Sequence, residues 1–198
     1  SSGLGEILKM AVIKDARLFS ILEDDGERLL SSKFLDCESA DEVINRAVVG
    51  MKVELENNLW EIDLKRKVDF GHSFSPIIEM RSIHDKGERV EGNIPLTHGQ
   101  AVALDVQYSC LLSNARGLLS DADVRRVFKT ARSLDLPTNH PLFNQPLVIL
   151  EALKDTMKHR NGAQNLPIPV QIGESTFFQD VRYAEIKAAA KAMVAINI

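Results

Sequence analysis

Three residues far apart in the 198-residue sequence, Glu6, His72 and His98, have side chains that could bind one divalent metal ion. Catalytic zinc takes three protein ligands, commonly histidine nitrogens and carboxylate oxygens, and keeps one position open for water or substrate. Each of the three residues adjoins a glycine, which leaves its side chain free to point into a cleft. Their spacing matches no compact motif such as HExxH. The fold itself must therefore bring them together.

Lys9 lies three residues after Glu6, so the two side chains are neighbours on one face of a predicted helix. This pair also supports a simpler interpretation. Glu6 and Lys9 could form an exposed ion pair, which contributes little stability. His72 and His98 would then be satisfied polar groups in a metal-free helical interaction module. The residue types alone leave both hypotheses open.

His72 lies in the stretch VDFGHSFSPIIEM, residues 68–80. Gly71 and the serines Ser73 and Ser75 allow a tight backbone around the histidine. Pro76 occupies a place where the first turn of a new helix accepts proline, because that position needs no backbone N–H. We therefore expect His72 to lie in a short loop just before a helix.

The remaining elements are predicted to be mainly helical, with one late β-hairpin. Apolar residues recur at helical spacing in most of the chain, and the segment 100–112 is apolar nearly all round, which predicts a buried central helix. The spacing of apolar residues departs from the helical period between residues 161 and 178, where Pro167, Pro169 and Gly173 flank two short runs. The predicted helices cover residues 4–22 (ended by Gly26), 39–55, 59–70, 77–80, 100–112, 121–134, 146–157 and 183–196. The hairpin is predicted over residues 168–178 and a polar loop over residues 81–95.

Bulk properties exclude several classes of partner. The net charge of −4 and a pI near 5.8 give no general attraction to nucleic acid or to an acidic membrane. Two cysteines without a CxxC pattern indicate neither a disulfide framework nor a cysteine zinc site, as is typical of a reducing cytoplasm. The sequence contains no run of about 20 apolar residues of the kind that spans a membrane.

Three segments together resemble a known enzyme superfamily. The runs Gly5-Glu6-Ile7-Leu8-Lys9, Phe70-Gly71-His72-Ser73-Phe74 and Leu96-Thr97-His98-Gly99 are similar, in order and context, to the metal-binding segments of the dehydroquinate synthase superfamily of sugar phosphate cyclases. This resemblance implies that Glu6, His72 and His98 are metal ligands. It also implies catalytic roles for Lys9, as a substrate-contacting lysine, and for Asp69.

Departures from the dehydroquinate synthase pattern indicate a different substrate. Pro76 stands in place of the family's second histidine, Asp69 in place of an asparagine, Lys65 in place of an arginine, and Met51 in place of a lysine that binds the substrate carboxylate. Losing cationic and bidentate carboxylate binders is consistent with a substrate that has no carboxylate. The resemblance therefore favours the branch that acts on sedoheptulose 7-phosphate, a neutral ketose phosphate.

Two cyclase activities of that branch remain open. The FGHSFSP run and the later HRNGAQ and LPIP runs resemble both 2-epi-5-epi-valiolone synthase and desmethyl-4-deoxygadusol synthase. The implied phosphate or substrate contacts are Lys65, Lys158, His159 and Arg160. The mixture of Lys and Arg and the many Ile and Asn favour the deoxygadusol enzyme. Two activities outside the branch, 3-dehydroquinate synthase and an iron-dependent alcohol or glycerol dehydrogenase relative, rank lower, and Pro76 disfavours the dehydrogenase.

The resemblance also sets the expected domain organisation and partners. Residues 1–198 correspond to the family's helical metal- and substrate-binding domain, and the family's N-terminal NAD-binding α/β domain has no counterpart here, since the sequence has no GxGxxG motif. The implied cofactors are NAD and zinc, or another divalent metal such as cobalt. The implied partners are a sugar phosphate, the N-terminal domain and a second copy in a homodimer.

Overall fold

The computed structural model describes residues 2–35, 38–84 and 92–196, and within these ranges it contains eight α-helices and one hairpin. The predicted fold class, mainly helical with a late hairpin, is confirmed. None of these described helices is long and apolar enough to cross a bilayer. The elements are α1 (Ser2–Ile13), α2 (Ala16–Ser31), α3 (Glu38–Glu56), the 3-10 turn η1 (Lys67–Asp69), α4 (Ser75–His84), α5 (His98–Ala115), α6 (Asp121–Ser133), α7 (Pro146–His159), β1 (Leu166–Gln171), β2 (Glu174–Phe178) and α8 (Tyr183–Ala195).

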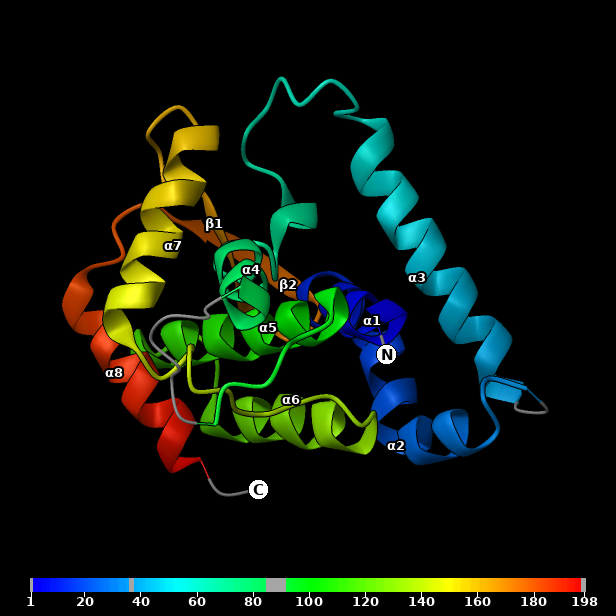
Figure 1. Ribbon diagram of the computed structural model, residues 1–198. Helices are drawn as coiled ribbons and strands as arrows, with labels where there is room; N and C mark the ends of the chain where they lie inside the picture. The colour runs from blue at the N-terminus through cyan, green and yellow to red at the C-terminus, as the bar shows by residue number, and fades with distance from the viewer. Residues whose placement is uncertain (1, 36–37, 85–91, 197–198) are drawn as a thin grey trace.

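Helix α5 forms the centre of the domain. It packs against α1, α4, α6, α8 and β1, and Figure 1 shows it crossing the middle of the molecule with these elements around it. Nearly every residue from Gly99 to Ser113 is buried. Thr97 is the N-cap of this helix, and its backbone N–H donates to Gln100 Oε1 at 2.9 Å. The all-round apolar sequence of this helix is explained by its central position.

The prediction of one helix over 4–22, ended by Gly26, was wrong. The chain forms two helices, with a break at Lys14 and Asp15, and Asp15 caps α2 by accepting a hydrogen bond from Leu18 N at 2.9 Å. Gly26 lies inside α2, where it packs against Ser133 of α6. The predicted helical stripe concealed the break because residues on both sides of it face the same core.

The prediction of a helix over 59–70, whose apolar residues would have to face the core, was also wrong. Trp60 is 83% exposed and Ile62 is 87% exposed. The segment is a loop stabilised by hydrogen bonds within it. Asn58 Nδ2 donates to Asp63 O, and Asp63 N donates to Asn58 Oδ1. Only its end becomes regular, as η1, directly before His72.

The other predicted elements agree closely with the structure. Pro76 lies in the first turn of α4, and β1 pairs antiparallel with β2 in a register that sets Leu166 opposite Phe178. The predicted loop 81–95 begins later than expected, because α4 continues to His84. Residues 85–91 of that loop lie outside the described residues.

Candidate metal and substrate site

Glu6 and His98 meet because α1 and α5 cross in near backbone contact. A Cβ on Gly5 would lie 2.0 Å from Gly99 O, and a Cβ on Gly99 would lie 2.1 Å from Ser2 O. Real Cβ atoms do not approach other atoms so closely, so only glycine at both positions permits this crossing. Glu6 directly follows one glycine and His98 directly precedes the other, so the crossing places both side chains at the same point.

His72 is brought to that point by a tightly held loop between η1 and α4. Gly71 has φ +75°, a left-handed conformation that favours glycine, and its backbone packs on Val102 of α5. His72 N donates to Asp69 O at 3.0 Å, which closes the turn. Ser75 Oγ donates to Gly71 O at 2.7 Å, which ties the loop to the start of α4.

The buried carboxylate of Asp105, on α5, holds the same loop through hydrogen bonds to its backbone. Its Oδ2 accepts hydrogen bonds from Phe74 N at 2.6 Å and from Ser75 N at 2.8 Å. Burial raises the pKa of Asp105 to about 6, although these two hydrogen bonds favour its charged form. Asp105 thus caps α4 and connects the His72 loop to the same central helix that carries His98.

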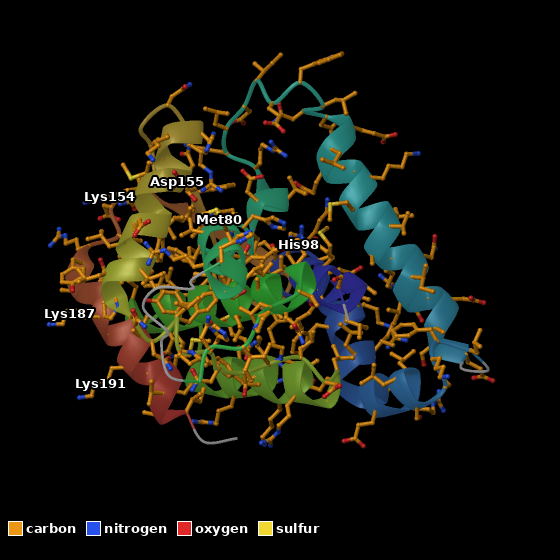
Figure 2. All side chains as sticks on the ribbon, viewed as in Figure 1. Met80, His98, Lys154, Asp155, Lys187 and Lys191 are labelled. Carbon is orange, nitrogen blue, oxygen red and sulfur yellow. The ribbon has the colours of Figure 1, made fainter. Side chains whose placement is uncertain are left out.

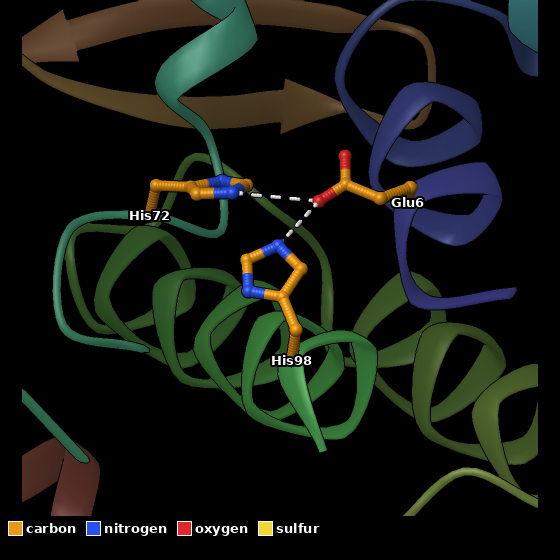
Figure 3. A group of neighbouring side chains, drawn as sticks. All are labelled: Glu6, His72 and His98. Carbon is orange, nitrogen blue, oxygen red and sulfur yellow. Dashed lines mark hydrogen bonds and ion pairs between the residues drawn. The ribbon is translucent and has the colours of Figure 1, made fainter. Parts of the chain in front are cut away.

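The three candidate ligands converge on one point (Figure 3). Glu6 Oε1 lies 3.3 Å from His98 Nε2 and 3.4 Å from His72 Nε2. One ligand atom from each residue can be chosen so that all three lie within 4.8 Å of one another. The two imidazole rings are 5.2 Å apart between centroids and are tilted by 51°. Figure 2 shows His98 toward the centre of the molecule, whereas Lys187 and Lys191 project from the outer face of α8.

Each candidate ligand is also held through a second polar atom. Lys9 Nζ lies 2.5 Å from Glu6 Oε2, His72 Nδ1 lies 3.2 Å from the carbonyl oxygen of Phe70, and His98 Nδ1 lies 3.0 Å from Glu79 Oε2. Glu6 Oε1 and the two Nε2 atoms are therefore the atoms that face the shared point. Metal-binding histidines commonly have such a partner on the nitrogen that does not bind the metal.

Lys9 is buried, with only 1% of its surface exposed, so the interpretation of Glu6 and Lys9 as an exposed ion pair was wrong. Its ammonium also donates to Val68 O at 3.1 Å. Burial opposes ionisation of Glu6, but the adjacent Lys9 charge and hydrogen bond hold the pKa of Glu6 below its ordinary value. Burial and, next, the Lys9 charge lower the pKa of His72. The cluster therefore favours a charged carboxylate beside a neutral imidazole, which are the protonation states that bind a metal.

A cavity of about 240 Å³ adjoins His72 and continues toward the end of α7. Asp69, a predicted site residue, forms ion pairs with two arginines in the cavity wall. Its carboxylate oxygens lie 3.4 Å from Arg66 Nε and 3.4 Å from Arg160 Nη2. Arg160 is 6% exposed, and its guanidinium also donates to Gln164 O and Asn165 O. His159 lines the same cavity. The carboxylates of Glu61, Asp69 and Asp155 also line the cavity, so its guanidinium and imidazole groups are the candidate phosphate donors.

Other predicted site residues lie farther from this cavity. Lys65 is exposed and belongs to the surface loop, while the next residue, Arg66, lines the cavity. Lys158 side-chain atoms are 72% exposed and pair with Asp155 at 2.8 Å. Met51, on α3, lines a separate apolar groove of about 690 Å³ between α1 and α3, which Glu6 also borders.

Sequence reasoning misses three contributors. It places Arg66 in a solvated basic cluster, residues 65–67, and gives Glu79 and Asp105 no role. Glu79 and Asp105 each interrupt an apolar helical run, and a carboxylate in such a place is a usable signal that a polar partner lies opposite. For Arg66 no such signal exists, because consecutive basic residues in a loop give no periodicity.

The fold and the site together define a class: a helical domain with the fold of a dehydroquinate synthase-like C-terminal domain, in which a carboxylate and two imidazoles meet beside a cavity that Arg66 and Arg160 line. The chain belongs to the 3-dehydroquinate synthase C-terminal family, whose model matches residues 3–159. The resemblance inferred from the three motifs is thereby confirmed.

Individual relatives define the similarity further. A 2-epi-5-epi-valiolone synthase of Actinomyces sp. is 44% identical over 198 residues, covering 98% of this chain and 49% of the relative. The structure of a 2-epi-5-epi-valiolone synthase from Streptomyces hygroscopicus subsp. jinggangensis 5008, solved with NAD⁺ and Zn²⁺ bound, superposes with a TM-score of 0.89 at 43% identity, over 98% of this chain and 51% of that one. The chain thus spans about half the length of these relatives.

The preference for the deoxygadusol enzyme is less well supported than its alternative. A demethyl-4-deoxygadusol synthase of Trichormus variabilis is 27% identical over 195 residues, covering 95% of this chain and 45% of the relative. The second cyclase of the branch, 2-epi-5-epi-valiolone synthase, agrees better with the comparisons. The preference rested on overall composition, which reflects the bias of a whole genome. Composition carries no information about the side chains that surround a substrate.

Proposed function

We propose that this chain is the metal- and substrate-binding half of a sugar phosphate cyclase of the 2-epi-5-epi-valiolone synthase type, which acts on sedoheptulose 7-phosphate. The observation that carries the proposal is the convergence of Glu6, His72 and His98 beside the cavity lined by Arg66 and Arg160. The similarity to valiolone synthases supports the choice of branch. An N-terminal NAD-binding domain in the same protein, a homodimer and a cytoplasmic location belong to this proposal.

The three candidate ligands fit a zinc ion. Oxygen and nitrogen ligands about 2.0 to 2.2 Å from a tetrahedral zinc lie roughly 3.4 Å apart. The observed separations of 3.3 and 3.4 Å from Glu6 Oε1 to the two Nε2 atoms match that spacing, and one ligand atom from each residue lies within 4.8 Å of the other two. Two imidazoles and one carboxylate also form a common catalytic zinc donor set, which leaves a fourth position for substrate oxygen. Cobalt accepts the same ligand types.

The bound metal would supply Lewis-acid polarisation of substrate oxygens, and NAD would supply hydride transfer. The residues of this chain bind and orient. Lys9 holds Glu6 through one carboxylate oxygen, and because an ammonium has three N–H donors, of which Glu6 and Val68 occupy two, one N–H remains for a substrate oxygen. Arg66, Arg160 and His159 would bind the phosphate, and Asp69 keeps the two guanidinium groups in place.

Phosphate release by the full-length protein tests this proposal. With NAD and zinc, we expect phosphate release from sedoheptulose 7-phosphate and a product with the mass of 2-epi-5-epi-valiolone. His72→Ala should abolish turnover. Lys187→Ala, a change at an exposed cation on the outer face of α8, is the matched control and should retain it. Release from the sugar acid substrate of dehydroquinate synthase instead would overturn the proposed substrate, and a deoxygadusol mass would overturn the branch.

A further inference from the structure

Glu79 contacts the one candidate ligand that begins a helix. Glu79 lies on α4, and its Oε2 is 3.0 Å from Nδ1 of His98, the first residue of α5. The other nitrogen of that ring, Nε2, is 3.3 Å from Glu6 Oε1. The His98 ring is therefore held between two carboxylates on two different helices. The carboxylate of Glu79 lies on the side of the ring away from the shared point, so Glu79 is no candidate for a fourth ligand.

The two histidines of the site differ in how Nδ1 is held. His72 Nδ1 faces the backbone carbonyl of Phe70, two residues away in the same loop, so its orientation is fixed locally. His98 has an exposed side chain and precedes the first full turn of α5, and its Nδ1 partner is a side chain on another helix. A neutral imidazole has one N–H and one lone pair. A carboxylate at Nδ1 keeps the N–H there, which leaves the lone pair of Nε2 directed at the shared point.

The position of Glu79 is itself fixed relative to His98. Ser82, one turn further along α4, accepts a hydrogen bond from Leu96 N at 3.0 Å, and its hydroxyl donates to Glu79 O at 2.7 Å. The backbone just before His98 is thus tied to the helical turn that carries Glu79. The contact between Glu79 and His98 is accordingly part of how α4 and α5 pack.

We propose that Glu79 is a positioning residue for the metal: it selects the His98 tautomer and ring orientation that present Nε2 to the ion. This inference rests on the metal site of the proposed function. Loss of an outer partner of a metal-binding histidine typically lowers metal affinity about 10- to 100-fold. We expect that effect from Glu79→Ala, and a smaller one from Glu79→Gln, whose amide oxygen can still accept the Nδ1 hydrogen bond without the charge.

The test measures zinc affinity of the full-length protein by competition with a chromophoric chelator. The visible spectrum of the cobalt-loaded protein provides a second readout that reports ligand geometry. Glu151→Gln is the matched control: Glu151, on α7, pairs at 2.5 Å with Arg81 of α4, the helix that carries Glu79, and it pairs with no histidine among the described residues. We expect it to leave the zinc affinity and the cobalt spectrum at wild-type values, while both Glu79 variants shift the spectrum and excess zinc restores turnover.

The outcomes separate this inference from the proposed function. If His98→Ala weakens zinc binding and both Glu79 variants bind zinc as tightly as the wild type, the role of Glu79 is refuted and the metal site stands. If neither His98→Ala nor His72→Ala changes zinc affinity, the metal site itself is refuted. Glu79→Gln preserves the shape of the side chain, so it decides the matter even if Glu79→Ala fails to fold.

Discussion

His140 and the pair formed by His72 and His98 occupy opposite kinds of environment. His140 is 4% exposed, its Nε2 lies 3.0 Å from Ile94 O, and its Nδ1 accepts a hydrogen bond from Leu142 N at 3.3 Å. Both of its nitrogens are thus used by backbone groups, and burial lowers its pKa. In His72 and His98 only Nδ1 has such a partner, the Phe70 carbonyl for His72 and the Glu79 carboxylate for His98, and Nε2 is directed at Glu6.

This difference shows what separates a ligand histidine from a structural one. His140 is more buried than either candidate ligand, but burial alone is a weak criterion, because His72 is itself partly buried, with 30% of its side chain exposed. The distinguishing property is whether a second nitrogen remains available beside a carboxylate. His140 stabilises the segment before α5, whereas the other two histidines and Glu6 form a site whose components come from α1, the loop before α4, and α5.

The largest expected effect is on metal binding. In the full-length protein, His72→Ala and His98→Ala should each weaken zinc binding by more than about 100-fold, because loss of an outer partner alone costs about 10- to 100-fold. His140→Ala should leave the affinity unchanged in the folded fraction. Chelator competition measures all three. Loss of zinc binding in the folded His140 variant would contradict the division between the two kinds of histidine.

A second effect should arise where α1 crosses α5. Gly5→Ala places a methyl group 2.0 Å from Gly99 O, so the helices must separate, and overpacking of this kind costs about 1 to 3 kcal/mol or more. Because Glu6 moves with α1, zinc affinity should fall as well. Gly3→Ala is the matched control in the same helix, since a Cβ there meets nothing within 4 Å. Equal zinc affinity and unfolding midpoints for the two variants would contradict the role assigned to the crossing.

Much of this architecture could be predicted from sequence, for identifiable reasons. The all-round apolar run of α5 predicts a central helix, and Pro76 marks the start of α4. The break between α1 and α2 escapes prediction although Asp15 is a good N-cap, because the apolar stripe continues across it. Periodicity describes one face of an element. It does not reveal a break between two helices when both helices keep their apolar faces toward the same core.

The candidate site was less accessible to sequence reasoning than the fold. Glu6, His72 and His98 could be grouped only through resemblance, since no local spacing links residues whose meeting depends on two glycines in near contact. The prediction placed Lys65 at the site, whereas Arg66 lines the cavity, and this difference also arises because local sequence does not report tertiary contacts. In an irregular loop, which of two adjacent cations turns inward depends on the acceptors that tertiary packing supplies, here Asp69.

Substitution of His140 should lower the free energy of unfolding and leave the zinc affinity of the folded protein unchanged. His140→Ala removes a buried hydrogen bond with Leu142 N and a part-buried one with Ile94 O, and it leaves a cavity, a loss of about 2 to 4 kcal/mol. Two further variants separate the contributions: the oxygen of His140→Asn can still accept from Leu142 N, and the amide of His140→Gln can reach Ile94 O. Urea unfolding should rank both between the wild type and alanine. Stability of the alanine variant equal to the wild type would show that His140 is dispensable.

The smallest expected effect is the pH dependence that His140 contributes. Burial lowers the pKa of folded His140, whereas in the unfolded chain it titrates near its ordinary value of 6.5. Below that pH the unfolded chain binds more protons than the folded one, so the stability that His140 confers is complete above pH 6.5 and declines as the pH falls toward the folded pKa. The difference in unfolding free energy between wild type and His140→Ala, followed from pH 7.5 to 5 in metal-free protein, isolates this contribution from the titration of Asp105 and His72. That difference should shrink as the pH falls. A difference that grows on acidification would mean that folded His140 favours its charged form, which would place an acidic partner, and not backbone groups, at its nitrogens.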